Sequence, residues 1–123
     1  TVSNGNVTIQ YNSSGIDINM VPSNQITIFR IVQELINNSL KHSNCTDIFV
    51  DCSQNGTLFL ITVEDNGIGF NSTDLDYFSG LGLKNIKNRV ELLRGKVEVR
   101  SGSFQGTIFN IELTVQQQNE EKI

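Results

Sequence analysis

Hydrophobic residues alternate with polar residues near both ends of the chain, and this period of two is typical of β-strands. Near the N-terminus the alternation runs over residues 7–11 and resumes over residues 16–20, after a turn-forming Asn-Ser-Ser-Gly segment. We therefore expect the first twenty residues to form a hairpin. Near the C-terminus the same period predicts strands over residues 97–99 and 107–115, separated by a turn.

Between residues 25 and 42 the period changes to that of an amphipathic helix. Its apolar positions, spaced by three or four residues, are Ile28, Ile31, Val32, Leu35, Ile36 and Leu40. A second stretch with helical spacing runs from Leu83 to Leu93, and Gly95 follows it as an expected C-terminal stop. The sequence thus predicts two helices, each with one buried face.

Two more strands are predicted between the helices, on either side of the hairpin signal Asn55-Gly56. The second of them, residues 57–64, is apolar on both faces, which is typical of a central strand that is covered, or nearly covered, on both sides. The element order ββαββαββ indicates an α+β fold, a two-layer α/β sandwich with the helices on one face of the sheet. We expect one domain over residues 1–115 and a frayed polar tail over residues 116–123.

Composition and charge narrow the range of functions. The chain has 123 residues, enough for one domain, and 37% of them are hydrophobic, which is ordinary for a globular protein. The formal net charge of −4 argues against a nucleic-acid-binding module with a broad basic surface. Six of the nine basic residues gather around the second predicted helix, where they form either a solvated helix face or a docking site for phosphate or a partner.

Segments that would direct the chain to a membrane or to secretion are not visible in the sequence. No apolar run is long enough to span a bilayer, and the N-terminus carries no secretory signal. Because the chain starts at Thr1 rather than at a methionine, we expect an excised fragment. Cys45 and Cys52 lie seven residues apart, and with a single histidine they fit no zinc framework, so we expect two reduced thiols.

One face of the first predicted helix carries a row of polar side chains that could do chemistry: Glu34, Asn38, Lys41 and His42. The amide oxygen of Asn38 suits Mg²⁺, the ammonium group of Lys41 suits phosphate, and Glu34 could act as a base near an attacking hydroxyl group. The same spacing also describes the solvent face of an ordinary amphipathic helix. The helix alone leaves both interpretations open.

Two glycine-containing segments follow. Asp65 leaves the apolar strand and enters a turn with Gly67 and Gly69, where its carboxylate could accept a hydrogen bond from an exocyclic amine and the glycines could let a flat ligand approach. Further along, Gly80-Leu81-Gly82-Leu83 opens the second helix, and such a helix start is a potential anion site. Each segment alone is also compatible with a loop that binds no ligand.

Taken together, and with Gly106-Thr107 before the last strand, these segments resemble the N, G1, G2 and G3 boxes of the GHKL ATPase and kinase superfamily. The finer pattern resembles the catalytic ATP-binding domain of bacterial sensor histidine kinases of the nitrate-sensor and desaturase-sensor type. Arg30-Ile31-Val32-Gln33-Glu34 and Gly82-Leu83-x-x-Ile86-x-x-Arg89-Val90 carry this finer resemblance, which extends over residues 7–115. The short spacing between the G1 and G2 glycines, residues 70–79, implies a short lid.

The resemblance implies the Bergerat ATP-binding fold, with a mixed, mainly antiparallel sheet and ATP held between the helical layer and the lid. Asp65 would bind the adenine amine, Thr107 would assist through water, and Gly67 and Gly69 would shape the adenine pocket. Asn38 would ligate Mg²⁺, and Glu34 would be the acid/base or orienting residue for transfer of the γ-phosphoryl group. The residues implied at the phosphate end are Lys41, His42, Gly80, Gly82 and Leu83.

By the same resemblance the phosphate acceptor is a histidine in dimerisation helices that are absent from this chain, and His42 lies inside the N box instead. The expected partners are that dimerisation domain, a response regulator and, for the parent protein, a second copy, with no direct contact to nucleic acid. The parent is expected to be anchored in the bacterial inner membrane, with this domain in the cytoplasm. The alternatives are a GHKL serine kinase of the anti-sigma-factor type, a nucleotide-binding regulatory module without phosphoryl transfer, and an interaction domain that binds no nucleotide.

Overall fold

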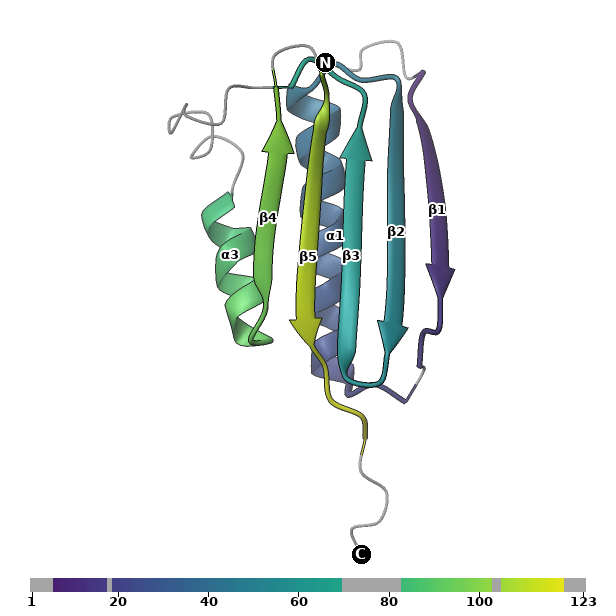
Figure 1. Ribbon diagram of the computed structural model, residues 1–123, viewed down its shortest axis with the longest axis vertical. Coiled ribbons are helices and arrows are strands. Elements are labelled where there is room, and N and C mark those ends of the chain that lie inside the picture. The colour runs from purple at the N-terminus through teal and green to yellow at the C-terminus, as the bar shows by residue number, and fades with distance from the viewer. Residues whose placement is uncertain (1–5, 18, 70–82, 103–104, 119–123) are drawn as a thin grey trace, which may run out of the picture.

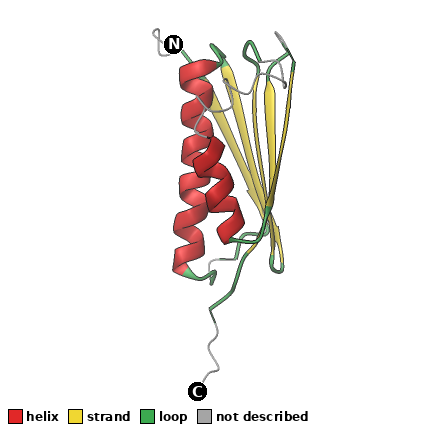
Figure 2. Ribbon diagram, turned by 90° about the vertical axis from the view of Figure 1, so that its left-hand side faces the viewer, coloured by secondary structure: helices red, strands yellow, loops and turns green. Residues whose placement is uncertain are grey.

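The computed structural model describes residues 6–17, 19–69, 83–102 and 105–118. In chain order the elements are β1 (Thr8–Ser14), α1 (Pro22–His42), β2 (Asp47–Asn55), β3 (Leu58–Asp65), α3 (Leu83–Leu92), β4 (Lys96–Ser101) and β5 (Thr107–Thr114). The strands form one sheet in the order β1-β2-β3-β5-β4 (Figure 1). Figure 2 shows that both helices cover the same face of this sheet. The predicted two-layer α+β sandwich is therefore confirmed.

The predicted N-terminal hairpin is wrong. Strand β1 pairs in parallel with β2, from Thr8 opposite Asp47 to Ser14 opposite Ser53, and the described residues after Gly15 add no second strand beside it. The chain instead leads to α1, which begins at Pro22, and before it does so the Asp17 amide donates to the side-chain oxygen of Gln54 in β2 at 2.9 Å. The alternation of residues 16–20 was misleading because, among the described residues there, Ile16 and Met20 line a cavity beside α1 rather than pack on a neighbouring strand.

That cavity lies between β1, β2 and the first half of α1 and has a volume of about 570 Å³. Its walls are mainly apolar, with Tyr11 and Cys52 from the sheet and Phe29 from α1. Burial raises the pKa of the Cys52 thiol, and burial together with the neighbouring Cys52 raises the pKa of Tyr11. Cys45 and Cys52 are both buried and free, as expected for reduced thiols.

Strand β3 is central, between β2 and β5, but it is covered on only one side. Its inward residues Phe59, Ile61 and Val63 are buried under the helices, whereas Leu58 and Leu60 on the other face are 42% and 37% exposed. The expectation of cover on both faces is therefore wrong, because both helices lie on one side. Apolar side chains on the second face of this strand face solvent.

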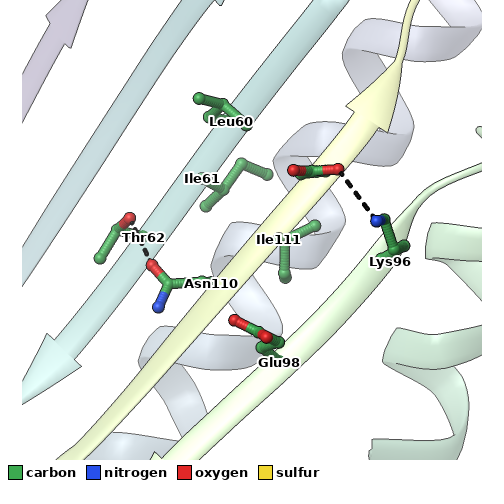
Figure 3. Close-up of a pocket in the computed structure, with 8 residues that line it drawn as sticks. Leu60, Ile61, Thr62, Lys96, Glu98, Asn110 and Ile111 are labelled. Carbon is green, nitrogen blue, oxygen red and sulfur yellow. Dashed lines mark hydrogen bonds and ion pairs between the residues drawn. The ribbon is translucent and has the colours of Figure 1, made fainter.

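The open face of the sheet has a shallow depression of about 250 Å³ across β3, β5 and β4 (Figure 3). The Thr62 hydroxyl donates to the side-chain oxygen of Asn110 at 2.9 Å, and the Lys96 ammonium lies 3.8 Å from a Glu112 carboxylate oxygen. Cross-strand pairs of this kind are typical of a solvated sheet face.

The hairpin between β2 and β3 is confirmed: Asn55 pairs with Leu58, and Gly56 makes the turn. The end of α3 differs from the prediction. The left-handed residue after this helix is Arg94, with φ of +50°, and not Gly95. A side chain at Gly95 would collide with the Glu112 carbonyl, so this glycine permits close packing against β5.

Helix α1 begins at Pro22, a residue well suited to a first turn because its missing N–H needs no partner there. The helix faces the sheet with Ile31, Leu35 and Ser39, and α3 does so with its own buried stripe, Leu83, Ile86 and Val90. Neither described helix is long and apolar enough to cross a membrane.

The polar segment after β5 is bound to the start of α1. The Gln116 amide donates to the Asn24 side-chain oxygen at 2.8 Å, and the Gln116 carbonyl accepts from the Val21 amide at 2.8 Å. Residues 116–118 are therefore part of the folded unit, although the sequence predicts that the tail starts at residue 116.

Candidate functional site

A row of side chains crosses the inner face of the sheet at the end of β3. The alternation Phe59, Ile61, Val63 continues to Asp65, so the carboxylate points inward with the core residues. The strand register places Ile48 of β2 and Thr107 of β5 opposite Asp65 on either side. The next residue in the row is Ser101 of β4, opposite Thr107. At this level of the sheet, three neighbouring polar side chains, Asp65, Thr107 and Ser101, therefore take the place of the apolar side chains.

The Asp65 carboxylate is buried, with only 6% of the residue exposed, and it is held by two donors. The Ser39 hydroxyl donates to Oδ2 at 2.8 Å, and the Gly67 amide donates to Oδ1 at 2.9 Å. No basic side chain within the described ranges forms an ion pair with this carboxylate. Since each carboxylate oxygen has two acceptor sites, the hydrogen bonds among the described residues leave one site per oxygen for a further N–H donor.

The turn after Asp65 packs tightly against the end of α1. The Ile68 amide donates to the Ser43 carbonyl at 2.8 Å, and a side chain at Gly67 would collide with that same carbonyl. At Gly69, where φ is +67°, a side chain would collide with the Gly102 carbonyl. Both glycines are therefore required by contacts within the protein. That they also shape an adenine pocket stays a prediction.

Asn66 was not predicted as a site residue, yet it connects this turn to the start of β2. Its side-chain oxygen accepts from the amides of Thr46 and Asp47, both at 3.0 Å. Its side-chain NH₂ donates to the Thr46 hydroxyl at 2.9 Å and to the Asp47 carboxylate at 3.2 Å. The Asp65–Gly67 turn is thus held on both sides, by α1 and by β2.

Thr107 lies beside Asp65 in the strand register and is 6% exposed, and that the two residues bind the base stays a prediction. Its hydroxyl oxygen is 3.0 Å from the hydroxyl oxygen of Ser101, which donates to the Gly106 carbonyl at 2.8 Å. A side chain at Gly106 would collide with the Asp65 carbonyl. Ser101 is a further group that the sequence did not single out, because only the β4–β5 register brings it here.

Glu34 and Asn38 lie in the second half of α1, next to the buried stripe of this helix. One flank of this helix, with Ile28 and Val32, lines the cavity near β1. Helical spacing places Glu34 and Asn38 on the opposite flank. That flank is on the side of α3, which packs beside α1 (Figure 2). Glu34 Oε1 and Asn38 Nδ2 are buried and have no hydrogen-bond partner among the described residues. Arg89 Nε on α3 is a third such atom. Unpartnered buried polar atoms cost about 1–3 kcal/mol each and are uncommon outside functional sites.

The remaining predicted residues divide into three groups. Lys41 and His42 are exposed in the last turn of α1, near the Asp65 turn. Leu83 starts α3 and buries its side chain in the core at 5% exposure, so only its backbone can face a ligand. Gly80 and Gly82 lie outside the described residues.

The donor set constrains how a metal ion could be held. In the described part of the chain no three His, Cys, Asp or Glu side chains are close enough together to hold a metal ion. Asn38 can supply a single amide oxygen, and Glu34, four residues earlier on α1, has a buried carboxylate oxygen with no partner among the described residues. Mg²⁺ in proteins commonly takes one or two protein oxygens and completes its shell with phosphates and waters. A single amide oxygen of Asn38 is compatible with an ion that arrives with a phosphorylated ligand, whereas the Asn38 atom without a described partner is its side-chain nitrogen, which could donate to phosphate but could not bind the ion.

Relatives of the chain with curated names are histidine kinases. The chain is 34% identical over 91 residues to the signal transduction histidine-protein kinase/phosphatase DegS of Brevibacillus brevis, covering 74% of this chain and 23% of DegS. It is 32% identical over 91 residues to the oxygen sensor histidine kinase NreB of Staphylococcus carnosus, covering 74% of this chain and 26% of NreB. The chain thus spans about a quarter of the length of these relatives.

Among solved structures, the histidine kinase domain of the blue-light activated histidine kinase EL346 from Erythrobacter litoralis is similar, with a TM-score of 0.68 and 25% identity. That match covers 87% of this chain and 52% of the other. The resemblance seen in the sequence motifs is thereby confirmed. Residues 23–117 match the family model described as histidine kinase-, DNA gyrase B-, and HSP90-like ATPase, and the chain therefore belongs to this ATPase family.

Proposed function

We propose that this chain is the catalytic ATP-binding domain of a two-component sensor histidine kinase, and that it transfers the γ-phosphoryl group of ATP to a histidine in a dimerisation domain outside the chain. The observation that carries the proposal is the buried Asp65 carboxylate, which has a donor on each oxygen and, within the described part of the chain, acceptor sites that these donors do not fill. The unpartnered atoms of Glu34 and Asn38, on the helix that leads to it, support the same proposal. Relatives named as histidine kinases favour it over a serine kinase of the anti-sigma-factor type.

At the base end, Asp65 would accept a hydrogen bond from the adenine amine, and Thr107 beside it would assist through water. Because this carboxylate is buried and has no basic partner among the described residues, it would gain from a hydrogen-bond donor on the ligand. The turn that contains Gly67 and Gly69 is held rigidly by its contacts to Ser43 and Gly102, so it would present the carboxylate in one orientation.

At the phosphate end, Asn38 would hold Mg²⁺ together with the phosphates, and the bound ion would neutralise phosphate charge. Lys41 and His42 would face the phosphates from the last turn of α1, and the backbone of Gly80, Gly82 and Leu83 would donate to them. Glu34 would orient the acceptor histidine or take its proton, since its carboxylate oxygen lacks a partner within the part of the chain described. Phosphoryl transfer depends mainly on this kind of positioning and charge neutralisation.

For the parent protein we propose a homodimer that passes the phosphoryl group to a response regulator. We also propose that it is anchored in the bacterial inner membrane with this domain on the cytoplasmic side. The kinase relatives, of which the chain spans about a quarter, support these assignments.

Calorimetric titration of the chain with ATP, in the presence and absence of Mg²⁺, tests the proposal. We expect saturable binding that Mg²⁺ strengthens, and little labelling of the chain alone by γ-labelled ATP, since the acceptor histidine lies elsewhere. Absence of binding heat and of any thermal stabilisation by Mg-ATP would contradict the proposal. Strong labelling of His42 in the isolated chain would contradict the assignment of the acceptor.

A further inference from the structure

The buried stripe of α1 and the inward row of β3 both change from apolar to polar at the same level of the fold. On the helix the stripe runs Ile31, Leu35 and then Ser39, which is 4% exposed. On the strand the row runs through Val63 to Asp65, which is 6% exposed. The two polar residues meet, with the Ser39 hydroxyl donating to Asp65 Oδ2 at 2.8 Å.

We propose that Ser39 is a positioning residue for base recognition: its hydroxyl holds the Asp65 carboxylate in the orientation that accepts the exocyclic amine of the nucleotide. The inference rests on the proposed ATP-binding function and assigns a residue to it that none of the sequence motifs identifies. Ser39 does not touch the base in this account, because it acts through Asp65.

The orientation of an aspartate carboxylate needs two anchors. The terminal torsion of this side chain has a broad energy profile, so a single hydrogen bond leaves the carboxylate free to rotate. In this chain the Gly67 amide holds Oδ1 and Ser39 holds Oδ2. Together they define the plane of the carboxylate and direct the two remaining acceptor sites toward a ligand.

Ser39 is itself held in place by the end of α1. Its carbonyl accepts from the Ser43 amide at 3.2 Å and from the Ser43 hydroxyl at 2.7 Å, and the Cys45 thiol lies 3.7 Å away. The hydroxyl position thus follows from a rigid backbone. An acceptor that is oriented before binding loses less conformational freedom when the ligand arrives, and this raises affinity.

The test compares two ligands that differ by one group: ATP and purine riboside 5′-triphosphate, which lacks the exocyclic amine. For the wild-type chain we expect calorimetry to show roughly tenfold tighter binding of ATP, because only ATP donates to Asp65. In Ser39→Ala we expect ATP affinity to fall about fivefold and purine riboside triphosphate affinity to change less than about twofold. The ratio of the two affinities is taken within one variant, so it does not depend on how stable that variant is.

Ser43→Ala is the matched control. It also removes a buried hydroxyl from the end of α1, but this hydroxyl donates to the Ser39 carbonyl and not to Asp65. We expect Ser43→Ala to leave the ratio of the two affinities unchanged, because the Ser43 amide still donates to the Ser39 carbonyl and keeps the backbone of Ser39 in place. Adding Ser39→Ala to Asp65→Asn should also have no further effect on ATP affinity, since the group that Ser39 positions has been replaced.

Three results would overturn the inference. In the first, Ser39→Ala weakens both ligands equally, which indicates a general structural role. In the second, Ser39→Ala leaves ATP affinity unchanged, and in the third, wild type binds both ligands equally. If wild type binds neither triphosphate, the proposed function itself fails, and this outcome is distinct from the other three.

Discussion

The two halves of the candidate site differ in how far the protein satisfies its own polar groups. At the end of β3, Asp65 has a donor on each oxygen, and the Asn66 side chain makes four hydrogen bonds to Thr46 and Asp47 at the start of β2. Along α1, Glu34 and Asn38 each bury an atom that has no partner among the described residues. We call the first half the base end and the second the phosphate end.

The difference corresponds to what each half is proposed to bind. A planar, neutral base is recognised by a few hydrogen bonds whose directions matter, so a rigid and already satisfied frame suits it. Phosphates and their cation bring strong charges of their own, and they can satisfy protein atoms that are left without partners. The base end is therefore built for orientation, whereas the phosphate end is completed by its ligand.

The largest effect is expected from disturbing the rigid turn of the base end. Gly69→Ala places a side chain at φ of +67° against the Gly102 carbonyl and should destabilise the chain by at least about 3 kcal/mol. Gly56→Ala is the control, since it has a similar φ of +64° but meets nothing within 4 Å, and should cost about 1–2 kcal/mol. Urea unfolding of both variants measures the difference. Equal losses would show that the Gly69 turn is not tightly packed.

A smaller effect, on binding rather than on folding, is expected from Asp65→Asn. An amide cannot accept on both sides of its terminal group, so ATP affinity should fall about 100-fold, equivalent to about 2.7 kcal/mol. Asp51→Asn on the exposed face of β2 is the matched control and should bind ATP like wild type. Calorimetry checks both. If Asp65→Asn kept full affinity, the carboxylate would not be the group that reads the base.

At the phosphate end, a substitution should raise the free energy of unfolding of the chain while it weakens ATP binding. Asn38→Leu removes a buried atom without a partner, so the chain without ligand should gain about 0.5–1 kcal/mol in its free energy of unfolding. The same change should weaken ATP binding in Mg²⁺ about tenfold and abolish most of the strengthening by Mg²⁺. Unfolding and titration of the same variant test the two parts. A loss of stability together with unchanged Mg²⁺ dependence would remove the contrast between the two ends.

The smallest effect is expected far from both ends, at the turn after α3. Arg94 has φ of +50°, which is costly for a residue with a side chain, so Arg94→Gly should stabilise the chain by about 0.5–1 kcal/mol and leave ATP affinity unchanged. Asn44→Gly, at φ of +55°, should gain less because asparagine tolerates this conformation. Thermal unfolding of the pair gives the comparison. A change in ATP affinity in Arg94→Gly would show that the basic residues near α3 take part in binding.

Much of this architecture follows from local patterns. The period of two in β3 is enough to place Asp65 on the inner face, and the signal Asn55-Gly56 is enough to place the β2–β3 turn. A strand was predicted over residues 7–11, whereas β1 continues through the expected turn to Ser14. Its partner was not predicted, because alternation does not reveal whether a strand pairs with its neighbour in sequence or in parallel with β2. The exposed Leu58 and Leu60 could not be placed correctly for a similar reason, since cover depends on where the helices pack.

The site shows the same division between local and distant information. Glu34, Asn38 and Asp65 carry motifs that can be read along the chain. Ser39 has its partner 26 residues away, and Ser101 reaches Thr107 only through strand register. The sequence did contain a signal for Ser39. Ile31 and Leu35 are followed, four residues later, by a serine at a position of the buried helical stripe where an apolar residue is expected.

The contrast between the two ends is tested most directly by mapping amide chemical shifts of the chain during titration with AMP and with Mg-ATP. AMP should shift the backbone amides of Gly67 and Ile68 and leave the side-chain amide of Asn38 unchanged. Mg-ATP should shift all three, because only its outer phosphates and cation reach the phosphate end. Shifts confined to the cavity around Phe29, or identical shifts from both nucleotides at Asn38, would contradict the account.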